Sequence, residues 1–299
     1  MDLVLTLVAG GAAPDLDDSI VARAGAALRA AGATVGVADW LAPRVACDLP
    51  CGGAPASTLR SAARSALAGA PVDLAVQMAA ARRRHFVVAD MESTIIENEM
   101  LDELAEAIGI GPRIAAVTAR AMAGELDFEG ALAERVALLA GTPTSLLDTV
   151  AARIRPNAGA TVLAATLAAH GVHAALVTGG FTYFAEPLAR RLGFAEVRAN
   201  RLEIAGGKLT GRVVPPVLGR AAKRAALEDI AGRLGVGVAA GVAIGDGAND
   251  LDMVEAAGLG VAWRGKAVLA ERAAARIDHA DLTALLYFMG YREAEFVRP

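Results

Sequence analysis

Three short apolar segments of the chain each end in a small, polar turn. Residues 86–89 lead into Asp90, residues 174–177 lead into Thr178-Gly179-Gly180, and residues 241–244 lead into Gly245-Asp246-Gly247. Stretches with helical spacing of apolar residues separate these segments, and this alternation is typical of a doubly wound parallel α/β sheet. In such a sheet, ligands bind beyond the carboxyl ends of the strands. We therefore expect the three polar turns to meet in one functional site.

One long block interrupts the alternation. Residues 98–166 read as helix after helix, with breaks at residues 109–112, Gly124 and residues 141–143. An insertion between the first and second strands of the sheet lies above its carboxyl edge, where it can act as a lid. We predict a helical cap at about residues 98–166.

The N-terminal part has a different pattern. We expect strands at residues 3–9, 34–38 and 44–47 and helices at residues 19–31 and 56–69, which gives the order βαββα. This order resembles the small α+β modules of the ACT type, which sense amino acids and often pair. We predict an ACT-like regulatory or dimerisation module at residues 1–78, a linker at residues 79–84 and a catalytic domain at residues 85–299.

Composition and charge exclude several classes of protein. Acidic and basic residues are interspersed and give a net charge of −4, which argues against a nucleic-acid partner. No apolar run reaches the ~20 residues that a membrane helix needs. The N-terminus has no basic region of the kind that opens a secretory signal, so we expect a cytoplasmic protein. Cys47 and Cys51 have no further cysteine or histidine nearby and are expected to be buried or idle thiols.

The first candidate for chemistry is the segment Asp90-Met91-Glu92-Ser93-Thr94. A carboxylate nucleophile needs a second group that moves protons, and a carboxylate two residues away can supply it. The alternative is structural, because an acidic residue at a strand end followed by Ser-Thr often only caps a helix.

The second candidate is Gly245-Asp246-Gly247-Ala248-Asn249-Asp250. Its carboxylates suit a hard, oxygen-preferring cation such as Mg²⁺. An ordinary glycine turn with an Asx cap is the alternative interpretation.

Two further features suit phosphate. The Thr178 hydroxyl and the exposed amides of Gly179 and Gly180 can bind phosphate oxygens. Lys223, on a helix expected at residues 221–234, can neutralise a phosphoryl group. A lone lysine on a helix is more often part of a solvated face, so its significance depends on the other motifs.

Taken in this order, the motifs resemble those of the haloacid dehalogenase-like hydrolases: DxDx[TV], a hydroxyl at a strand end, a lysine and a GDGxND-type loop. Residues 97–104, 122–128, 135–139, 177–181 and 279–287 narrow the resemblance to the phosphoserine phosphatases. The resemblance covers residues 85–296, and the N-terminal module is similar to the bacterial long form of that family.

The resemblance implies a role for each matching residue. Asp90 would be the nucleophile and Glu92 the general acid and base. Mg²⁺ would be held by Asp90, the Glu92 backbone carbonyl and Asp246, with support from Asp250. The phosphate would be bound by Thr178, Gly179, Lys223 and Asn249. The substrate's amino and carboxylate groups would face Glu99 and Arg135, and Met122 and Phe128 would form the pocket wall. Without the family context, Glu99 and Arg135 could equally be a surface ion pair or solvated charges.

Glu92 departs from the family pattern, which usually has aspartate there. One added methylene displaces the carboxyl group, and a ~1 Å misplacement of a catalytic group can lower a rate ~100-fold. We still expect an active enzyme, because glutamate retains the acid–base function.

The resemblance therefore implies Mg²⁺-dependent hydrolysis of a small-molecule substrate, O-phospho-L-serine, to L-serine and phosphate through an aspartyl-phosphate, the last step of serine biosynthesis. Two alternatives remain open: a phosphatase for another small phosphomonoester, or an inactive regulatory protein that senses an amino acid. A homodimer formed through the N-terminal module is a further expectation.

Overall fold

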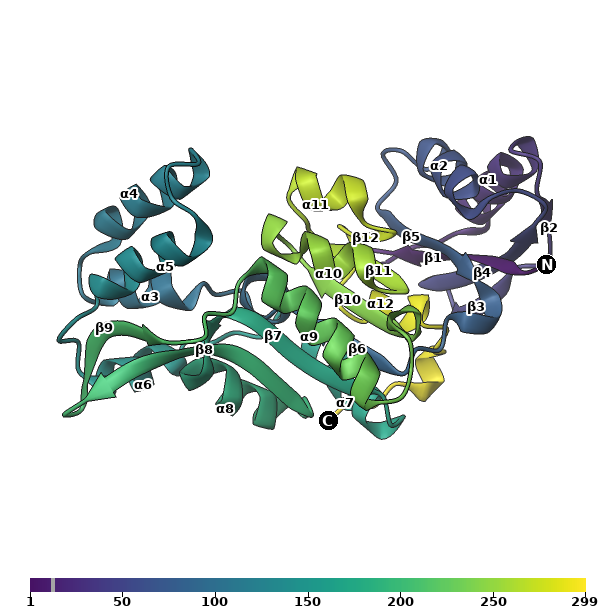
Figure 1. The fold of residues 1–299 in the computed structure, drawn as a ribbon. Helices are drawn as coiled ribbons and strands as arrows, with labels where there is room; N and C mark the ends of the chain where they lie inside the picture. Colours follow the sequence, from purple (N-terminus) through teal and green to yellow (C-terminus); the bar gives the residue numbers. More distant parts are fainter. Residues whose placement is uncertain (12–13) are drawn as a thin grey trace.

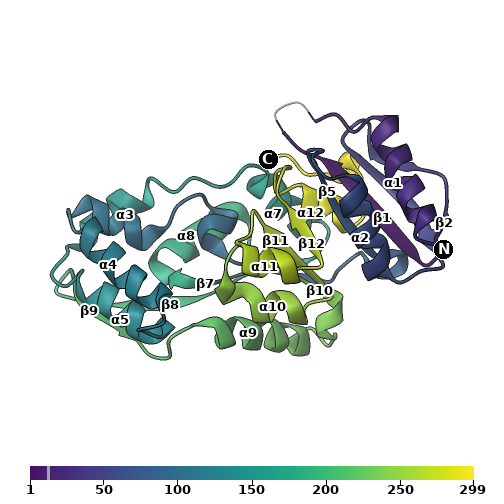
Figure 2. The ribbon, with the colours of Figure 1, turned by 90° about the horizontal axis from the view of Figure 1, so that it is seen from above.

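The structure, a computed structural model, describes residues 1–11 and 14–299, apart from the side chain of Met122. Its strands form one 12-stranded sheet in the order β2-β4-β1-β5-β12-β11-β10-β6-β7-β8-β9, with β3 paired to β4. The sheet runs along the molecule from the N-terminal module at one end to the helical cap at the other (Figure 1). The view from above shows the same arrangement (Figure 2).

Six strands at the centre of this sheet are parallel. They are β6 (Phe86–Ala89), β7 (His173–Phe181), β8 (Glu196–Ala205), β10 (Gly241–Gly245), β11 (Leu259–Trp263) and β12 (Ala275–Ile277). In spatial order, β8-β7-β6 are followed by β10-β11-β12, so the chain reverses its direction of winding between β6 and β10. Ligands bind at such a switch point in doubly wound sheets. The predicted fold class is confirmed.

Both faces of the parallel strands are buried. Val87 and Ala89 of β6 pack into one apolar cluster, while Phe86 and Val88 pack into another on the opposite face, as the two-residue period of a strand requires. The helices of this part are α7 (Ala160–Ala169), α8 (Thr182–Leu192), α9 (Arg220–Arg233), α10 (Leu251–Ala256), α11 (Ala267–Arg272) and α12 (Ala284–Phe288). Buried residues of α7, α8 and α12 join the first cluster, and those of α9, α10 and α11 join the second.

The cap contains more than helices. Its helices are α3 (Met100–Ala107), α4 (Gly111–Met122), α5 (Phe128–Ala137) and α6 (Thr144–Ala151). The hairpin of β8 and β9 (Lys208–Val214) extends to this region, where Gly141 N donates to Leu209 O at 2.8 Å and Leu209 N donates to Thr142 O at 2.9 Å. Gly206 and Gly207 form the hairpin turn with φ of 57° and 72°, a conformation that favours glycine. The hairpin therefore supports the cap from a distant part of the sequence.

The N-terminal module consists of β1 (Leu3–Ala9), α1 (Asp18–Ala30), β2 (Thr34–Val35), β3 (Asp39–Ala42), β4 (Ala46–Gly52), α2 (Ala56–Ala66) and β5 (Val72–Met78). The strands expected at residues 34–38 and 44–47 differ in extent: the first shortens to β2, and Arg44, with φ of 58°, lies in the turn between β3 and β4. We did not expect β5, because the buried polar residues Asp73 and Gln77 interrupt its apolar pattern. The ACT-like assignment and the domain boundaries stay predictions.

The module is joined to the parallel sheet by β5, which pairs antiparallel with β12 at Leu74 and Arg276. The Asp73 carboxylate accepts hydrogen bonds from the backbone amides of residues 278, 279 and 280. The Gln77 side-chain amide donates to Phe288 O at 2.6 Å. The buried polar residues of β5 thus hold the two parts of the chain together.

In the described part of the chain, no helix combines the length and apolar character that crossing a membrane requires.

Candidate active site

Asp90 lies at the carboxyl end of β6, the strand next to the switch point. Its backbone amide donates to Ile244 O of β10 at 3.0 Å, which extends the pairing of the two strands by one residue. Only 4% of Asp90 is exposed. Its Oδ1 accepts hydrogen bonds from Met91 N at 2.8 Å and from Lys223 Nζ, also at 2.8 Å. In the described structure both of these donors contact Oδ1.

Lys223 reaches the site from the first turns of α9. Its ammonium group contacts Asp90 Oδ1 at 2.8 Å and Asp250 Oδ1 at 2.6 Å, and the residue is 1% exposed. Burial acts to lower the pKa of Lys223, but the two neighbouring carboxylates outweigh it and raise that pKa. Lys223 is therefore a permanent positive charge behind the strand ends rather than the solvated lysine of the alternative interpretation.

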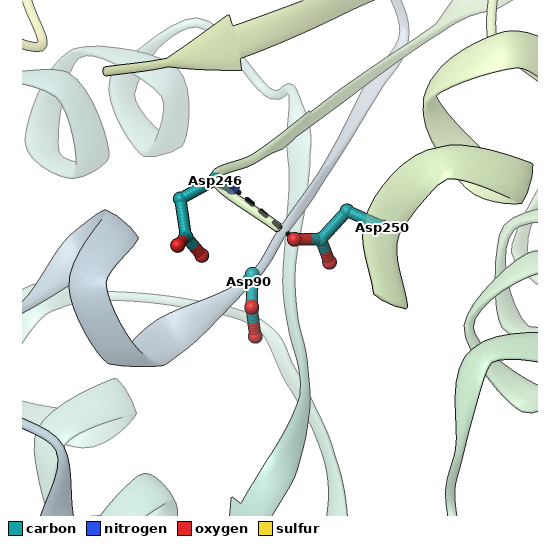
Figure 3. Close-up of side chains that lie close together, drawn as sticks. All are labelled: Asp90, Asp246 and Asp250. Carbon is teal, nitrogen blue, oxygen red and sulfur yellow. Dashed lines mark hydrogen bonds between the residues drawn. The ribbon is translucent and has the colours of Figure 1, made fainter. Parts of the chain in front are cut away.

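Asp90, Asp246 and Asp250 form a group of acids at the switch point (Figure 3). Each offers one oxygen, and these oxygens all lie within 4.8 Å of one another. Burial, followed by the charge of Asp90, raises the pKa of Asp250 to about 7 and also raises the pKa of Asp246. Crowded carboxylates of this kind match the hard oxygen ligands that Mg²⁺ prefers, and a cation would relieve their mutual repulsion.

The loop that carries Asp246 and Asp250 is built around this arrangement. Asp250 Oδ2 accepts hydrogen bonds from Asp246 N at 3.1 Å and Gly247 N at 3.0 Å, which closes the turn. A Cβ at Gly245 would lie 2.3 Å from Asp250 Cγ, so a larger residue there would displace the carboxylate. Glycine is therefore required at position 245, because the Asp250 side chain lies too close to the Gly245 backbone for a larger residue to fit.

Glu92 lies in the irregular turn after Asp90, where Ser93 has φ of 52°. Glu92 Oε1 accepts a hydrogen bond from Met100 N at 3.0 Å, at the start of α3. A Cβ at Gly180 would lie 2.9 Å from Glu92 Oε2, so the second glycine after Thr178 makes room for this carboxyl group. Desolvation, followed by the negative charges of Glu99 and Asp90, raises the pKa of Glu92 to about 8. The group is therefore protonated at neutral pH in the metal-free protein.

The polar segment Thr178-Gly179-Gly180, expected from the sequence as a turn after the strand, forms part of the last residues of β7, where the register with β8 shifts. Thr178 Oγ1 accepts a hydrogen bond from Gly180 N at 3.0 Å, and Thr178 is 1% exposed. The Phe128 ring lies close to Gly179, because a Cβ at Gly179 would be 3.3 Å from Phe128 Cζ. Phe128 thus brings the first residue of cap helix α5 against the loop of the sheet.

Asn200 supports the segment around Gly179. Its role was not predicted from the sequence. Its side-chain amide donates to Gly179 O at 2.8 Å, while its side-chain oxygen accepts from Leu218 N at 2.6 Å. Asn200 is 1% exposed. It fixes the Gly179 loop relative to the segment that leads into α9 and Lys223. The sequence gives no distinct signal for Asn200, because β8 also contains several charged residues.

The cap contributes groups of opposite charge. Glu99 Oε1 accepts a hydrogen bond from Ser93 Oγ at 2.6 Å. Desolvation in the cavity raises the pKa of Glu99, and Asp246 and Asp90 add to this effect, against the opposing hydrogen bond from Ser93. Arg135, in the last turn of α5, donates from Nε to Ala131 O at 3.2 Å, and its other guanidinium nitrogens have no hydrogen-bond partner among the described residues.

A cavity of about 180 Å³ joins these groups, and its lining comes from both the sheet and the cap: Asp90, Glu92, Glu99, Phe128, Arg135, Thr178, Gly179, Asp246, Asn249 and Lys266. Of the residues singled out in the sequence, Lys223 and Asp250 lie behind Asp90 rather than on the cavity wall. The side chain of Met122 lies outside the described structure. The remaining candidates are brought together.

Lys266 on this wall was missed by the sequence analysis. Its backbone amide donates to Asp246 O at 2.8 Å, and its Nζ lies 3.7 Å from Asp246 Oδ2. Its position in the sequence could have indicated a role in the site. Lys266 follows β11, the strand beside β10, and so emerges at the same edge of the sheet. Lys266 offers a second cation at the mouth of the cavity.

Comparison with known proteins gives the same family that the sequence motifs resemble. The family model described as haloacid dehalogenase-like hydrolase matches residues 87–255. A phosphoserine phosphatase of Streptomyces coelicolor is 42% identical over 255 residues, which are 85% of this chain and 62% of that protein. A phosphoserine phosphatase of Streptococcus thermophilus is 42% identical over 196 residues, 66% of this chain and 91% of that protein. The chain thus spans about three fifths of the Streptomyces relative and nearly all of the Streptococcus one.

A solved structure resembles the whole chain. It is a hydrolase of the same family from Salmonella enterica serovar Typhi, with a TM-score of 0.83 and 27% identity. The similarity covers 97% of this chain and 99% of that one, so it includes the N-terminal module.

Proposed function

The chain belongs to the haloacid dehalogenase-like hydrolase family, and we propose that it is a Mg²⁺-dependent phosphatase that hydrolyses O-phospho-L-serine to L-serine and phosphate. One observation carries the proposal. The buried Asp90–Lys223 pair and Glu92 adjoin a single cavity into which the cap directs one acid, Glu99, and one base, Arg135. Relatives that are 42% identical are named for this activity.

The three acids fit a divalent cation, because each offers an oxygen within 4.8 Å of the others and burial raises the pKa of Asp246 and Asp250. Asp90, Asp246 and the backbone carbonyl of Glu92 would hold Mg²⁺, with Asp250 in support. When bound, the ion would supply positive charge to the phosphoryl oxygens and the nucleophile.

In the first step, Asp90 Oδ2 attacks phosphorus and the bond from phosphorus to the serine oxygen breaks. Glu92, protonated because its pKa is raised, gives its proton to the departing serine oxygen. Lys223 holds the other oxygen of Asp90 in place, and Thr178, Gly179 and Asn249 bind the phosphoryl oxygens. The products of this step are serine and an aspartyl-phosphate on Asp90.

In the second step, Glu92, now a carboxylate, takes a proton from a water molecule. The resulting oxygen attacks phosphorus, the bond from phosphorus to Asp90 breaks, and phosphate leaves. Glu92 is again protonated and Asp90 is again a carboxylate, so the cycle closes without any other reactant. The cap excludes bulk water from the ester until the first step is complete.

Selectivity would come from the cap. A phosphorylated amino acid carries one ammonium and one carboxylate group, which Glu99 and Arg135 complement, and arginine can bind a carboxylate through two parallel hydrogen bonds. Phe128 supplies an apolar wall, and Met122 is assigned the same role. We also propose that residues 1–78 form an ACT-like regulatory or dimerisation module, residues 79–84 a linker and residues 85–299 the catalytic domain. The proposal includes a homodimer that forms through residues 1–78.

The test of selectivity compares O-phospho-L-serine with two analogues in phosphate-release assays. Phosphoethanolamine lacks the carboxylate, and the phosphate ester of 3-hydroxypropanoate lacks the ammonium group. We expect Arg135→Met to lower kcat/KM for phosphoserine ~10-fold or more while changing phosphoethanolamine hydrolysis little, because the lost hydrogen bonds are charge-assisted. Arg113→Met, a change of an exposed arginine on α4, is the matched control. Equal losses on both substrates in Arg135→Met would contradict the assignment.

A further inference from the structure

A second polar cavity lies between the N-terminal module and the catalytic part. Its volume is about 250 Å³, and its walls come from α2 and the segment that follows it, from β5, from Arg276 of β12 and from residues 278 and 279 after that strand. It shares no lining residue with the active-site cavity.

The acids of this cavity are already engaged. Asp73 accepts hydrogen bonds from the backbone amides of residues 278, 279 and 280. Asp278 accepts from Arg276 Nε at 2.8 Å and contacts Arg276 Nη2 at 2.6 Å. Both carboxylates thus have hydrogen-bond partners other than Arg64.

The basic groups of the cavity come from both parts of the chain. Arg64 and Arg276 line the cavity with His279, and Arg60 lies one turn before Arg64 on α2. Arg60 donates from Nη1 to Ala274 O at 3.0 Å, which brings this face of α2 against the catalytic part. Arginine side chains from both parts of the chain therefore converge on the cavity.

Arg64 is the unsatisfied member of this group. Its Nη2 is buried and has no hydrogen-bond partner among the described residues. Burial, followed by the positive charges of Arg60 and Arg276, lowers the pKa of Arg64. A buried guanidinium donor without an acceptor is rare in folded proteins, and each such group requires an explanation.

We propose that this cavity binds a small oxyanion, a phosphate or a carboxylate, between Arg64 and Arg276. Guanidinium groups present paired N–H donors that match both kinds of oxyanion. An oxyanion in this place supplies the acceptor that Arg64 Nη2 lacks among the described residues. It also links α2 to the loop after β12, so binding strengthens the attachment of the module to the catalytic part.

The test is thermal unfolding of the full chain in EDTA, with inorganic phosphate or succinate as the probe. We expect one of these anions to raise the Tm of the wild type, of Arg23→Met and of Thr178→Val, but not that of Arg64→Met. Arg23→Met removes an exposed arginine of α1 and is the matched control. Thr178→Val weakens the proposed active-site contact with phosphate, so a retained shift assigns the binding to the second cavity.

The comparison of the two probes identifies the source of the oxyanion. A shift with phosphate alone indicates a phosphate group, and a shift with succinate alone indicates a carboxylate. A Tm of Arg64→Met that rises as much as that of the wild type would overturn the proposal, as would the absence of a wild-type shift with either anion.

A second measurement needs no variant. Hydrogen exchange of the wild type in EDTA should slow in α2 and in residues 274–280 when the effective anion is added. Unchanged exchange in both segments would also overturn the proposal. Because these experiments use no turnover, their outcome is independent of the proposed phosphatase activity.

Discussion

Lys223 Nζ lies 2.8 Å from Asp90 Oδ1, and the two side chains are 1% and 6% exposed. The pair is completed by Asp250, whose Oδ1 lies 2.6 Å from the same nitrogen. The lysine therefore neutralises acids from two different strand ends and orients the carboxylate assigned to attack phosphorus.

Replacement of Lys223 by methionine should damage both stability and turnover. Removal of one partner from a buried charge pair typically costs about 3–5 kcal/mol, because the remaining charges stay buried without compensation. We also expect kcat to fall at least ~100-fold, the scale for loss of one electrostatic contact in a transition state. Urea unfolding and phosphate release measure the two effects, with the exposed Lys208→Met as control. Wild-type values for both quantities would contradict the role given to Lys223.

The raised pKa of Glu92 predicts an unusual pH dependence of stability. The pKa is about 8 in the folded, metal-free protein, whereas an unfolded glutamate has a pKa of about 4.3. Between these values the folded state holds a proton that the unfolded state has lost, so the contribution of Glu92 to stability falls as pH rises from about 4.3 to about 8. Glu92→Gln should remove this fall in urea unfolding in EDTA between pH 5 and pH 8. The exposed Glu129→Gln serves as control, and a wild-type slope in Glu92→Gln would refute the shift.

The variant Glu92→Asp tests whether the geometry of the site suits glutamate better than aspartate at this position. The longer side chain accepts a hydrogen bond from Met100 N at 3.0 Å and lies against Gly180. A shortened carboxylate would move away from both, and a displacement of ~1 Å can lower a rate ~100-fold. We expect kcat for phosphoserine to fall in Glu92→Asp. An increase in turnover would mean that the scaffold is fitted to aspartate and that Glu92 limits the natural protein.

Variants of Asn200 test whether a residue outside the active-site cavity positions the groups that bind the substrate. It binds Gly179 O and Leu218 N, and so holds together the two segments that carry Thr178 and Lys223. Asn200→Leu should lower kcat ~10-fold or more through loss of this alignment, while Asn200→Asp, which still accepts from Leu218 N, should retain more activity. Circular dichroism checks that both variants fold. Equal and unimpaired turnover in the two variants would show that the alignment does not depend on Asn200.

Much of the catalytic part could be predicted from local sequence. The strands β6, β7 and β10 are short apolar runs, and their polar turns had to meet at one edge once the sheet was parallel. That reasoning brought Asp90, Thr178 and Asp246 together from positions far apart in the chain. The assignments to Glu99 and Arg135 came from resemblance alone, because solvated charges on helices carry no comparable signal.

The missed features depend on tertiary contacts. β5 contains Asp73 and Gln77, whose burial makes sense only when the loop after β12 and the end of α12 supply partners. Asn200 and Lys266 form hydrogen bonds with backbone groups of distant segments, and residue type alone does not predict such contacts. The hairpin of β8 and β9 was missed for a similar reason, since its support of the cap is visible only in the folded chain.

The most direct test of the central claim is phosphate release from O-phospho-L-serine by the wild type and by Asp90→Asn, each with Mg²⁺ and with EDTA. The account predicts metal-dependent release by the wild type and a loss of roughly 10⁴-fold or more in Asp90→Asn, the scale for removal of a nucleophile. Retention of most of the activity in a folded Asp90→Asn protein, or no release by the wild type with Mg²⁺, would contradict it.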